Sequence, residues 1–364
     1  MYFRNFRLLA KFIKDTIYNA KNNYFYNGKF YPKFLEWVPF DRFEDINQIG
    51  EGGFAKVYSA TWIDGKTKYK RHDGSLEKRE PEPIKVALKK LNESQNISPE
   101  YLNEIKILWN FYLNETSDTY LKFYGITKDD KTKKFMMIMQ LVNQGNLRSV
   151  LSSNFNNIVW IEKLLVLHNI LYDLKDLHKL GYFHKDLNIL LNRKEEPDKN
   201  LSYVSDFGLS GPSNEHKSDN KTCGVLPYIS PEVLNELSSG RSPFYNRKHD
   251  YSLALEICNG IRPEFGKGTP EIYKKLAYRY IYQEEENFGY KGKEIKATFD
   301  EANKEIPNIS TSHEKNPDAV YTSRVFTFSS NLPKPINSSI ITSYLDEDNK
   351  DCQDSKLFDL EVSS

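Results

Sequence analysis

The stretch Asp206-Phe207-Gly208 is the most informative part of the sequence for the expected fold. A second aspartate, Asp186, precedes Asp206 by 20 residues. Each aspartate follows an apolar stretch typical of a β-strand. Two carboxylates delivered to one cleft suit phosphoryl transfer, in which one accepts a hydroxyl proton and the other holds magnesium against phosphates. Either aspartate alone would be interpreted as a turn or cap residue. Their occurrence together with His184 and Phe207-Gly208 favours the phosphoryl-transfer interpretation.

A glycine-rich turn lies upstream and reads Gly50-Glu51-Gly52-Gly53-Phe54-Ala55-Lys56-Val57. Apolar segments flank the turn, so residues 46–58 are predicted to form a β-hairpin. Glycine lets the backbone approach a phosphate closely, because a side chain at Gly50, Gly52 or Gly53 would occupy the space that the anion needs. The turn alone is a weak signal, since an ordinary glycine hairpin has the same pattern.

Lys89 ends the strand-like stretch Val86-Ala87-Leu88-Lys89, where a lysine needs anionic partners. Phosphates and an acidic residue of the next predicted helix are the candidates. That helix starts at Ser98-Pro99-Glu100, because the serine can cap it and the proline suits the first helical position. We favour Glu104 as the partner of Lys89, since it lies at the edge of the apolar stripe. Glu100 is the alternative, although it suits the first helical turn better.

The composition limits the classes of function. At 364 residues, with 39% hydrophobic and 14% aromatic residues, the chain can bury a sizeable core. The formal net charge of +1 gives no indication of nucleic acid or an acidic membrane as a partner. The three cysteines lie far apart without a C-x-x-C pair, which argues against a disulfide framework or a zinc site. We therefore expect a reducing compartment and a cytoplasmic location.

The first twenty residues place apolar side chains at helical spacing between basic ones. No apolar run is long enough for a signal peptide or a transmembrane segment. A surface helix packed on the main domain is favoured, and contact with an anionic membrane is the alternative. The apolar positions of this predicted helix are Phe3, Phe6, Ala10, Ile13 and Ile17.

The chain divides into an N-terminal extension (1–45), a domain (46–280) and a polar tail (281–364). Within the extension, the tyrosine-rich residues 20–40 are expected to be irregular. The tail is rich in polar residues and has few apolar clusters, so that most of it cannot offset its own ordering entropy. Apart from a helix over 292–305, we expect the tail to be largely disordered.

The first part of the domain is predicted to be a small five-stranded sheet with one helix. Two strands come from the hairpin at 46–58, and the others are predicted at 84–91, 120–126 and 135–142. The basic residues of 64–83 indicate a solvated loop. A mainly helical part follows, and it begins with a long buried helix that ends near Gly181.

These motifs and their order resemble those of a protein kinase domain of the tyrosine-kinase-like group, over residues 46 to about 275. The resemblance implies an α+β, two-lobed fold. The small lobe (46–141) would contain the five-stranded sheet and one helix, and the mainly helical large lobe (142–280) would be truncated. ATP and Mg²⁺ are the implied cofactors. Protein substrates or signalling partners are also implied, with serine and threonine hydroxyls favoured over tyrosine.

The resemblance also implies roles for single residues. Asp186 would be the catalytic base, Lys89 and Glu104 would form a pair at the active site, and Asp206 would bind magnesium. Asn188 would be the second metal ligand. The residues expected to contact ATP are Gly50, Glu51, Gly52, Gly53, Phe54, Val57, Ala87, Lys89, Met139, Gln140 and Leu141.

The two largest departures from the family pattern are both losses of residues, whereas Ala55 and Lys185 are milder substitutions within its motifs. The family's metal-binding asparagine follows the catalytic aspartate by five residues, whereas Asn188 follows Asp186 by two. The three missing residues correspond to as much as about 10 Å of chain. The family's central large-lobe helix, which anchors the catalytic loop, is also not evident after Glu232. We therefore expect impaired activity, and the alternatives are a nucleotide-binding pseudokinase or a signalling scaffold.

Overall fold

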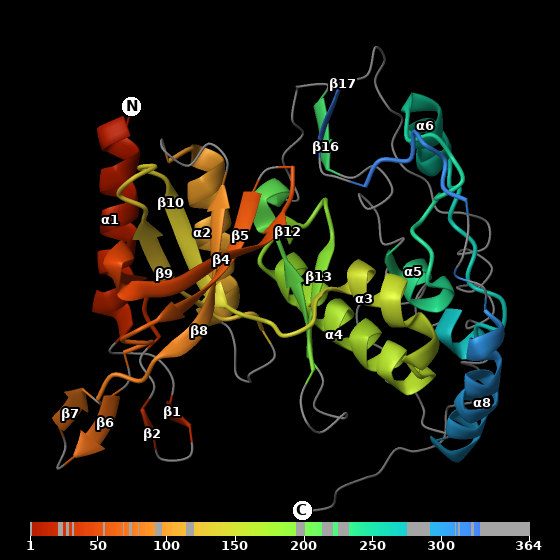
Figure 1. Cartoon of the computed structure of the whole chain (residues 1–364), viewed down its shortest axis with the longest axis horizontal. Helices are drawn as coiled ribbons and strands as arrows, with labels where there is room; N and C mark the ends of the chain where they lie inside the picture. Colours follow the sequence, from red (N-terminus) through yellow and green to blue (C-terminus); the bar gives the residue numbers. More distant parts are fainter. Residues whose placement is uncertain are drawn as a thin grey trace, which may run out of the picture.

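A computed structural model describes most of the chain (Figure 1). The described residues are 2–20, 25–26, 29–30, 33–53, 55–67, 69–72, 75–78, 80–91, 97–113, 120–193, 201–212, 221–224, 233–274, 292–309, 311, 314–321 and 324–327. The predicted ATP-binding residue Phe54 therefore lies outside them. No helix among these residues is both long enough and apolar enough to cross a membrane.

A six-stranded sheet forms one end of the molecule, at the left in Figure 1. Its strand order is β3-β9-β10-β8-β5-β4, and only β3 and β9 run parallel. Helices α1 (Tyr2–Asn19) and α2 (Pro99–Leu113) lie against it. The strands are β3 (Glu36–Trp37), β4 (Phe43–Glu51), β5 (Ala55–Trp62), β8 (Ile84–Leu91), β9 (Phe123–Lys128) and β10 (Phe135–Gln140).

Both faces of β10, a central strand of this sheet, are buried, and its successive side chains point to opposite sides. Met136 and Ile138 of β10 pack with Trp62 in a cluster on one face. Met137 and Met139 face the other way, into the main core with residues of α1 and α2. The continuous apolar run of β10 therefore reflects a strand covered on two sides.

The sixth strand, β3, corrects the prediction of a five-stranded sheet. It comes from the N-terminal extension, where residues 20–40 were expected to be irregular. Glu36 and Trp37 pair with Gly125 and Ile126 of β9. A Cβ atom at Gly125 would lie 2.0 Å from the carbonyl oxygen of Glu36, so glycine is what allows this close approach. A two-residue strand is too short to produce a periodic pattern, and the sequence therefore did not reveal it.

Helix α1 packs on the sheet with a face that is rotated from the predicted one and shares Ile13 with it. Leu9 and Ile13 are buried, and the Thr16 hydroxyl accepts a hydrogen bond from the Leu35 backbone at 3.1 Å. Phe6 and Ile17, both on the predicted apolar stripe, are 37% and 49% exposed. Apolar spacing located the helix correctly, whereas its rotation depended on how α1 meets the extension.

Helix α2 begins as the sequence predicts. The Ser98 hydroxyl accepts a hydrogen bond from the Tyr101 backbone at 3.1 Å, which confirms the predicted cap. Tyr101, Ile105 and Leu108 are buried in the main core. The same helix carries Glu104, so the cap and the buried stripe together determine where this carboxylate points.

Residues 64–83 contain a small hairpin instead of the predicted loop. Its strands are β6 (Tyr69–His72) and β7 (Ser75–Lys78). A second small hairpin, β1 (Phe25–Tyr26) with β2 (Lys29–Phe30), lies in the extension. β6 and β7 are rich in charged residues, so they lack the alternation of apolar and polar residues that predicts a strand.

The other end of the molecule is mainly helical, at the right in Figure 1. Its helices are α3 (Leu147–Asn154), α4 (Trp160–Lys179), α5 (Val233–Ser239), α6 (Tyr251–Cys258) and α8 (Gly292–Glu305). Short 3-10 helices occur at Phe40–Arg42, Phe155–Asn157, Phe207–Leu209 and Ile306–Asn308. The described short strands are β11 (Gly145–Asn146), β12 (Tyr182–Phe183), β13 (Asn188–Asn192), β14 (Leu201–Ser205), β15 (Gly211–Pro212), β16 (Lys221–Gly224) and β17 (Arg324–Thr327). They pair as β11-β13-β14, β12-β15 and β16-β17.

Helix α4 corresponds to the predicted long buried helix. It buries Leu167, Ile170 and Leu177, and it ends before Gly181, whose φ of +79° suits glycine. Ile161, which fits the same predicted stripe, is 65% exposed. The first turn of α4 is instead buried through Trp160 and Lys163, both 0% exposed, so Ile161 lies on its outer side.

The described part of the tail is folded, and the rest of the tail that was expected to be disordered lies outside the described residues. The expected helix is present as α8, and Phe299 and Ile306 are buried in the main core beside α4. Asn303 accepts a hydrogen bond from the backbone of Trp160 at 2.8 Å. A few well-spaced apolar side chains can anchor a segment whose average composition is polar.

Two adjacent leucines of α1 provide a test of how this helix packs. Leu9 is 1% exposed and Leu8 is 48% exposed. Leu9→Ala should lower the free energy of unfolding by about 2–5 kcal/mol, because it removes buried methyl groups and leaves a cavity. Leu8→Ala should change it by no more than about 0.5 kcal/mol. Urea unfolding of both variants checks this prediction, and equal effects would contradict the observed rotation of α1.

Candidate active site

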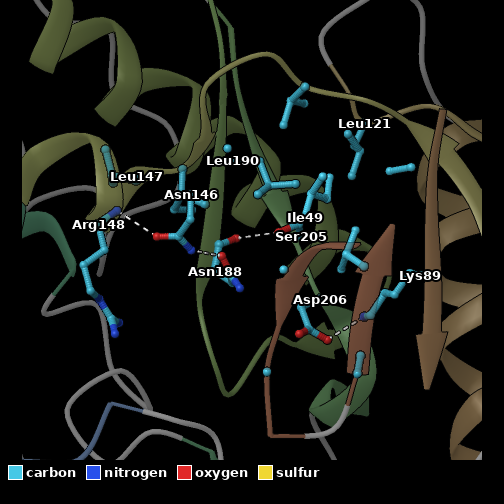
Figure 2. Close-up of a pocket in the computed structure, with 18 of the residues that line it drawn as sticks. Ile49, Lys89, Leu121, Asn146, Leu147, Arg148, Asn188, Leu190, Ser205 and Asp206 are labelled. Atoms are coloured by element: carbon cyan, nitrogen blue, oxygen red, sulfur yellow. Dashed lines mark hydrogen bonds and ion pairs between the residues drawn. The ribbon is translucent and has the colours of Figure 1, made fainter. Parts of the chain in front are cut away.

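A cleft of about 420 Å³ lies where the six-stranded sheet meets the helical end (Figure 2). Of the predicted site residues, those that line it are Gly50, Glu51, Gly52, Gly53, Val57, Ala87, Lys89, Met139, Gln140, Leu141, Asp186, Asn188 and Asp206. Glu104 lies behind Lys89 and does not line the cleft. The chain therefore brings residues from positions 50 to 206 to one hollow.

Lys89 forms the charged centre of this cleft. Its Nζ atom lies 2.6 Å from Glu104 Oε1 and 2.7 Å from Asp206 Oδ1. The side chains of Lys89 and Glu104 are 9% and 1% exposed, whereas that of Asp206 is 46% exposed. Glu104 therefore fixes the lysine from inside the protein, and Asp206 presents its carboxylate to the cleft.

Burial and charge act in opposite directions on these three groups. Burial lowers the pKa of Lys89, but the carboxylates of Asp206 and Glu104 outweigh burial and raise it above its usual value. Burial raises the pKa of Glu104, and Lys89 opposes that effect only in part. Burial also raises the pKa of Asp206, but the nearby ammonium outweighs it and the resulting pKa is lowered. Lys89 and Asp206 therefore remain charged at neutral pH.

A strained turn aims Asp206 into the cleft. Its φ and ψ are 67° and 68°, in the left-handed region that aspartate tolerates better than most residues. The next side chain, Phe207, is buried against Phe111 and His184, with ring centroids 5.5 and 5.0 Å apart. A Cβ atom at Gly208 would lie 3.4 Å from Glu104 Oε2, so a small residue is favoured there. Packing on both sides thus holds the turn.

The glycine-rich turn joins β4 to β5, as the predicted hairpin requires. The Gly52 amide donates to the carbonyl oxygen of Ala55 at 2.8 Å. Cβ atoms added at Gly50 or Gly52 would come no closer than 3.8 Å to another atom of the protein. Packing within the chain therefore does not require glycine at these two positions, and their bare backbone leaves space beside the cleft.

An apolar wall lies behind the glycine turn. Ala87 of β8 and Met139 of β10 pair across neighbouring strands, which places both at one level of the cleft. Sequence reasoning missed Ile49, Leu121 and Leu190, which also line the cleft (Figure 2). Ile49 directly precedes the glycine turn and is 55% exposed. Its position beside the turn was a sequence signal that could have identified it as a cleft residue.

Asn188 lies at the start of β13, two residues after Asp186. Its Oδ1 atom accepts a hydrogen bond from Asn146 Nδ2 at 2.7 Å (Figure 2). Asn146 in turn caps α3, because its own Oδ1 atom accepts from the Arg148 backbone at 2.8 Å. Asn188 is therefore held against the helical end, on the same side of the cleft as Asp186.

A polar wall that sequence reasoning missed closes the helical side of the cleft. Arg148 lies 3.7 Å from Glu236 Oε1 and donates to the carbonyl oxygen of Tyr321 at 3.3 Å. Glu236 comes from α5, and Tyr321 comes from the region predicted to be a disordered tail. No local motif connects these three residues, since Arg148 and Tyr321 are 173 positions apart.

His184 gives the site a pH dependence that can be measured. It is 4% exposed, and burial lowers its pKa to about 4 from the usual 6.5. The folded protein therefore favours neutral histidine, with Nε2 donating to the Ser205 carbonyl oxygen at 3.1 Å. The stability that neutral His184 contributes to the folded protein is present above about pH 6.5 and is lost as the pH falls toward 4.

Between about pH 7.5 and pH 5, this effect should lower the free energy of unfolding by roughly 2 kcal/mol. Urea unfolding of the wild type and of His184→Asn at both pH values isolates it. Between the same two pH values, the free energy of unfolding of the variant should fall by roughly 2 kcal/mol less than that of the wild type. Equal losses in the two proteins would show that His184 has an ordinary pKa.

Comparisons with known proteins agree with this arrangement. Residues 43–294 match the family model of protein tyrosine and serine/threonine kinases. Pats1, a probable serine/threonine-protein kinase of Dictyostelium discoideum, is 27% identical over 66% of this chain and 8% of its own length. The G-type lectin S-receptor-like serine/threonine-protein kinase CES101 of Arabidopsis thaliana is 28% identical, over 63% of this chain and 25% of its own.

The serine/threonine-protein kinase RAD53 of Saccharomyces cerevisiae is 27% identical over 40% of this chain and 19% of its own length. The chain thus spans a quarter or less of these three relatives. The family model, in contrast, covers well over half of the chain. Given that match and the charged cleft described above, this protein belongs to the protein tyrosine and serine/threonine kinase family.

Proposed function

We propose that the chain binds ATP with Mg²⁺ in the cleft and transfers the γ-phosphate to hydroxyl groups of proteins. One observation carries the proposal: the buried ammonium group of Lys89 lies between Glu104 and Asp206, opposite a turn of exposed glycine backbone. This arrangement combines a fixed cation with glycine backbone that no side chain covers, and phosphate oxygens can approach both.

The cleft fits such a nucleotide in size and lining. Its volume of about 420 Å³ lies within the range of small-molecule sites, about 300–1,000 Å³. The apolar wall at Ala87 and Met139 would hold the adenine, and backbone groups of Gln140 and Leu141 would face its edge. Gly50, Gly52 and Lys89 would then lie along the phosphates.

The residues also suit a magnesium ion, because magnesium prefers oxygen ligands. Asp206 would hold it through the carboxylate that faces the cleft. Asn188 would add its amide oxygen, which has a second lone pair beyond the one used by Asn146. Bound magnesium would supply positive charge that stabilises the phosphate oxygens during transfer.

In the proposed reaction, Asp186 accepts the proton of a substrate hydroxyl. The hydroxyl oxygen forms a bond to the γ-phosphorus while the bond to the β–γ bridging oxygen breaks, and ADP leaves. Lys89 stays in place through its ion pair with Glu104, so it orients the phosphates without moving. We place the nucleotide between the two lobes of a kinase fold of the tyrosine-kinase-like group, and we favour serine and threonine as acceptors in a cytoplasmic protein.

A second candidate, a nucleotide-binding pseudokinase, is favoured by the geometry after Asp186. The chain enters β13 at Asn188 only two residues later, and the hydrogen bond to Asn146 holds Asn188 there. A catalytic base displaced by even 1 Å costs on the order of a hundredfold in rate. The two candidates share nucleotide binding and differ in transfer.

Nucleotide binding can be tested with two lysines of one strand. ATP with Mg²⁺ at a hundredfold excess over its dissociation constant should stabilise the wild type by about 2.7 kcal/mol, which raises Tm. Lys89→Met should abolish most of this rise. Lys85→Met is the matched control, because Lys85 also lies on β8 but is 62% exposed, and it should keep the full rise. A wild-type Tm that ATP leaves unchanged would contradict both candidates.

Transfer can be tested separately by mass spectrometry of the protein after incubation with ATP and Mg²⁺. The wild type should gain phosphate, and Asp186→Ala should be slower by about 10²-fold or more because the general base is lost. Asp130→Ala, at an exposed turn, should match the wild type. If ATP raises Tm but no phosphate exceeds that of Asp186→Ala, the pseudokinase candidate replaces the active kinase.

A further inference from the structure

The last described part of the chain returns to the cleft. Tyr321 lines the same hollow as Asp186 and Asp206, although its segment follows α8. A few residues later, β17 pairs in antiparallel fashion with β16, from Lys221↔Thr327 to Gly224↔Arg324. Figure 1 shows this blue segment running from near α6 to β17. The described residues after α8 thus contact both the cleft and β16, which lies downstream of Asp206-Phe207-Gly208 in the chain.

Tyr321 is held from several directions. Its hydroxyl donates to the Pro243 carbonyl oxygen at 2.9 Å. The guanidinium carbon of Arg148 lies 5.1 Å from the centre of its ring, and the edge of the His249 ring packs against it at 4.8 Å between centroids. These contacts place an aromatic side chain at the helical wall of the cleft, beside Arg148 and Glu236.

The residues before Tyr321 are attached mainly through the backbone. The His249 amide donates to the Asp318 carbonyl oxygen at 3.2 Å, and the Asn316 amide donates to that of Tyr245 at 2.9 Å. His249 Nδ1 also lies 2.9 Å from the Val320 carbonyl oxygen. The docking therefore depends on the path of the segment, and Tyr321 is the residue of 314–321 that lines the cleft.

We infer that residues 314–321 and 324–327 act as an internal ligand of the cleft, which occupies the place where a protein substrate presents its hydroxyl to Asp186. This inference rests on the proposed function. A substrate chain must reach Asp186 from outside, past the helical wall where Tyr321 lies. An extended peptide that pairs with the edge of β16 that β17 occupies must also displace β17, because a strand edge pairs with one neighbour at a time.

The segment competes with the protein substrate and leaves the nucleotide part of the cleft open. Tyr321 is grouped with Arg148 and Glu236, which come from the helical end. Ala87, Met139 and Lys89, the residues proposed to hold ATP, come from the sheet. Release of the segment should therefore change the KM for the acceptor and leave the KM for ATP unchanged.

The contacts suit a segment that can be released. Residues 314, 315, 317 and 318 are exposed, and the ion pair between Lys248 and Asp318 has both side chains about 60% exposed, so it adds little. Tethering compensates for weak contacts, because a linked segment acts at an effective concentration of about millimolar. Regions with few buried apolar contacts open first.

A release variant of the full chain tests this inference: Tyr321→Ala, Val325→Pro and Phe326→Pro together. In an antiparallel pair, every second residue of β17 donates its backbone N–H group to β16. Proline has no N–H group, so prolines at two consecutive positions remove one of these hydrogen bonds in either register. Lys315→Ala, exposed in the same segment, is the control. Hydrogen exchange of the amides at 221–224 should be at least about tenfold faster in the release variant than in the wild type or the control.

A synthetic peptide of residues 314–327 tests the same contact without any need for activity. It should bind the release variant saturably and restore slow exchange at 221–224, and it should not bind the wild type. Equal exchange in wild type and release variant would overturn the inference, and so would failure of the peptide to bind the release variant. These results stand even if the protein proves unable to bind ATP, which would overturn only the proposed function.

If phosphate transfer is detected, steady-state kinetics with a protein acceptor complete the test. The release variant should show a lower KM for the acceptor, by about tenfold for a tether at this effective concentration, with the KM for ATP unchanged. An unchanged acceptor KM would contradict the inference, and an altered KM for ATP alone would assign the segment to the nucleotide part of the cleft.

Discussion

The ion pair between the buried ammonium group of Lys89 and the carboxylate of Glu104 is the interaction on which the site depends. Neither group could remain charged in that environment alone, because desolvating a single ion costs several kcal/mol. Glu104 therefore requires Lys89 at 2.6 Å, and Lys89 requires Glu104 together with Asp206. This requirement links β8 to α2 at a fixed distance and keeps the cation at the inner end of the cleft.

Asp206 completes the arrangement from the other end of the molecule. It reaches Lys89 through a left-handed turn that is held by the buried ring of Phe207 and by the lack of a side chain at Gly208. The sheet and the helical end are thereby connected through one charged contact, at 2.7 Å. Because Asp206 stays partly exposed, its carboxylate is available to a ligand while it supports the lysine.

The sequence predicted most of the elements that carry these groups, because each has a local cause. Ser98 caps α2, glycine at 181 ends α4, and alternating or continuous apolar runs produce β5, β8 and β10. The predicted site residues also meet in one cleft, apart from Glu104 behind it and Phe54 outside the described residues. Their order along the chain was informative because such motifs are short and each has a local chemical requirement.

Tertiary structure alone decided the features that depend on distant contacts. Periodicity shows that α1 is amphipathic, but only packing selects Leu9 over Ile17 as a buried residue. The two-residue strand β3 exists because Gly125 lets the backbone of Glu36 approach closely. The sequence around either residue does not predict that the two pair. Tyr321 reaches the cleft through partners more than seventy positions away, including Arg148 and Pro243. Local propensity determines elements, whereas burial across long sequence separations determines which faces and which ends of the chain complete the site.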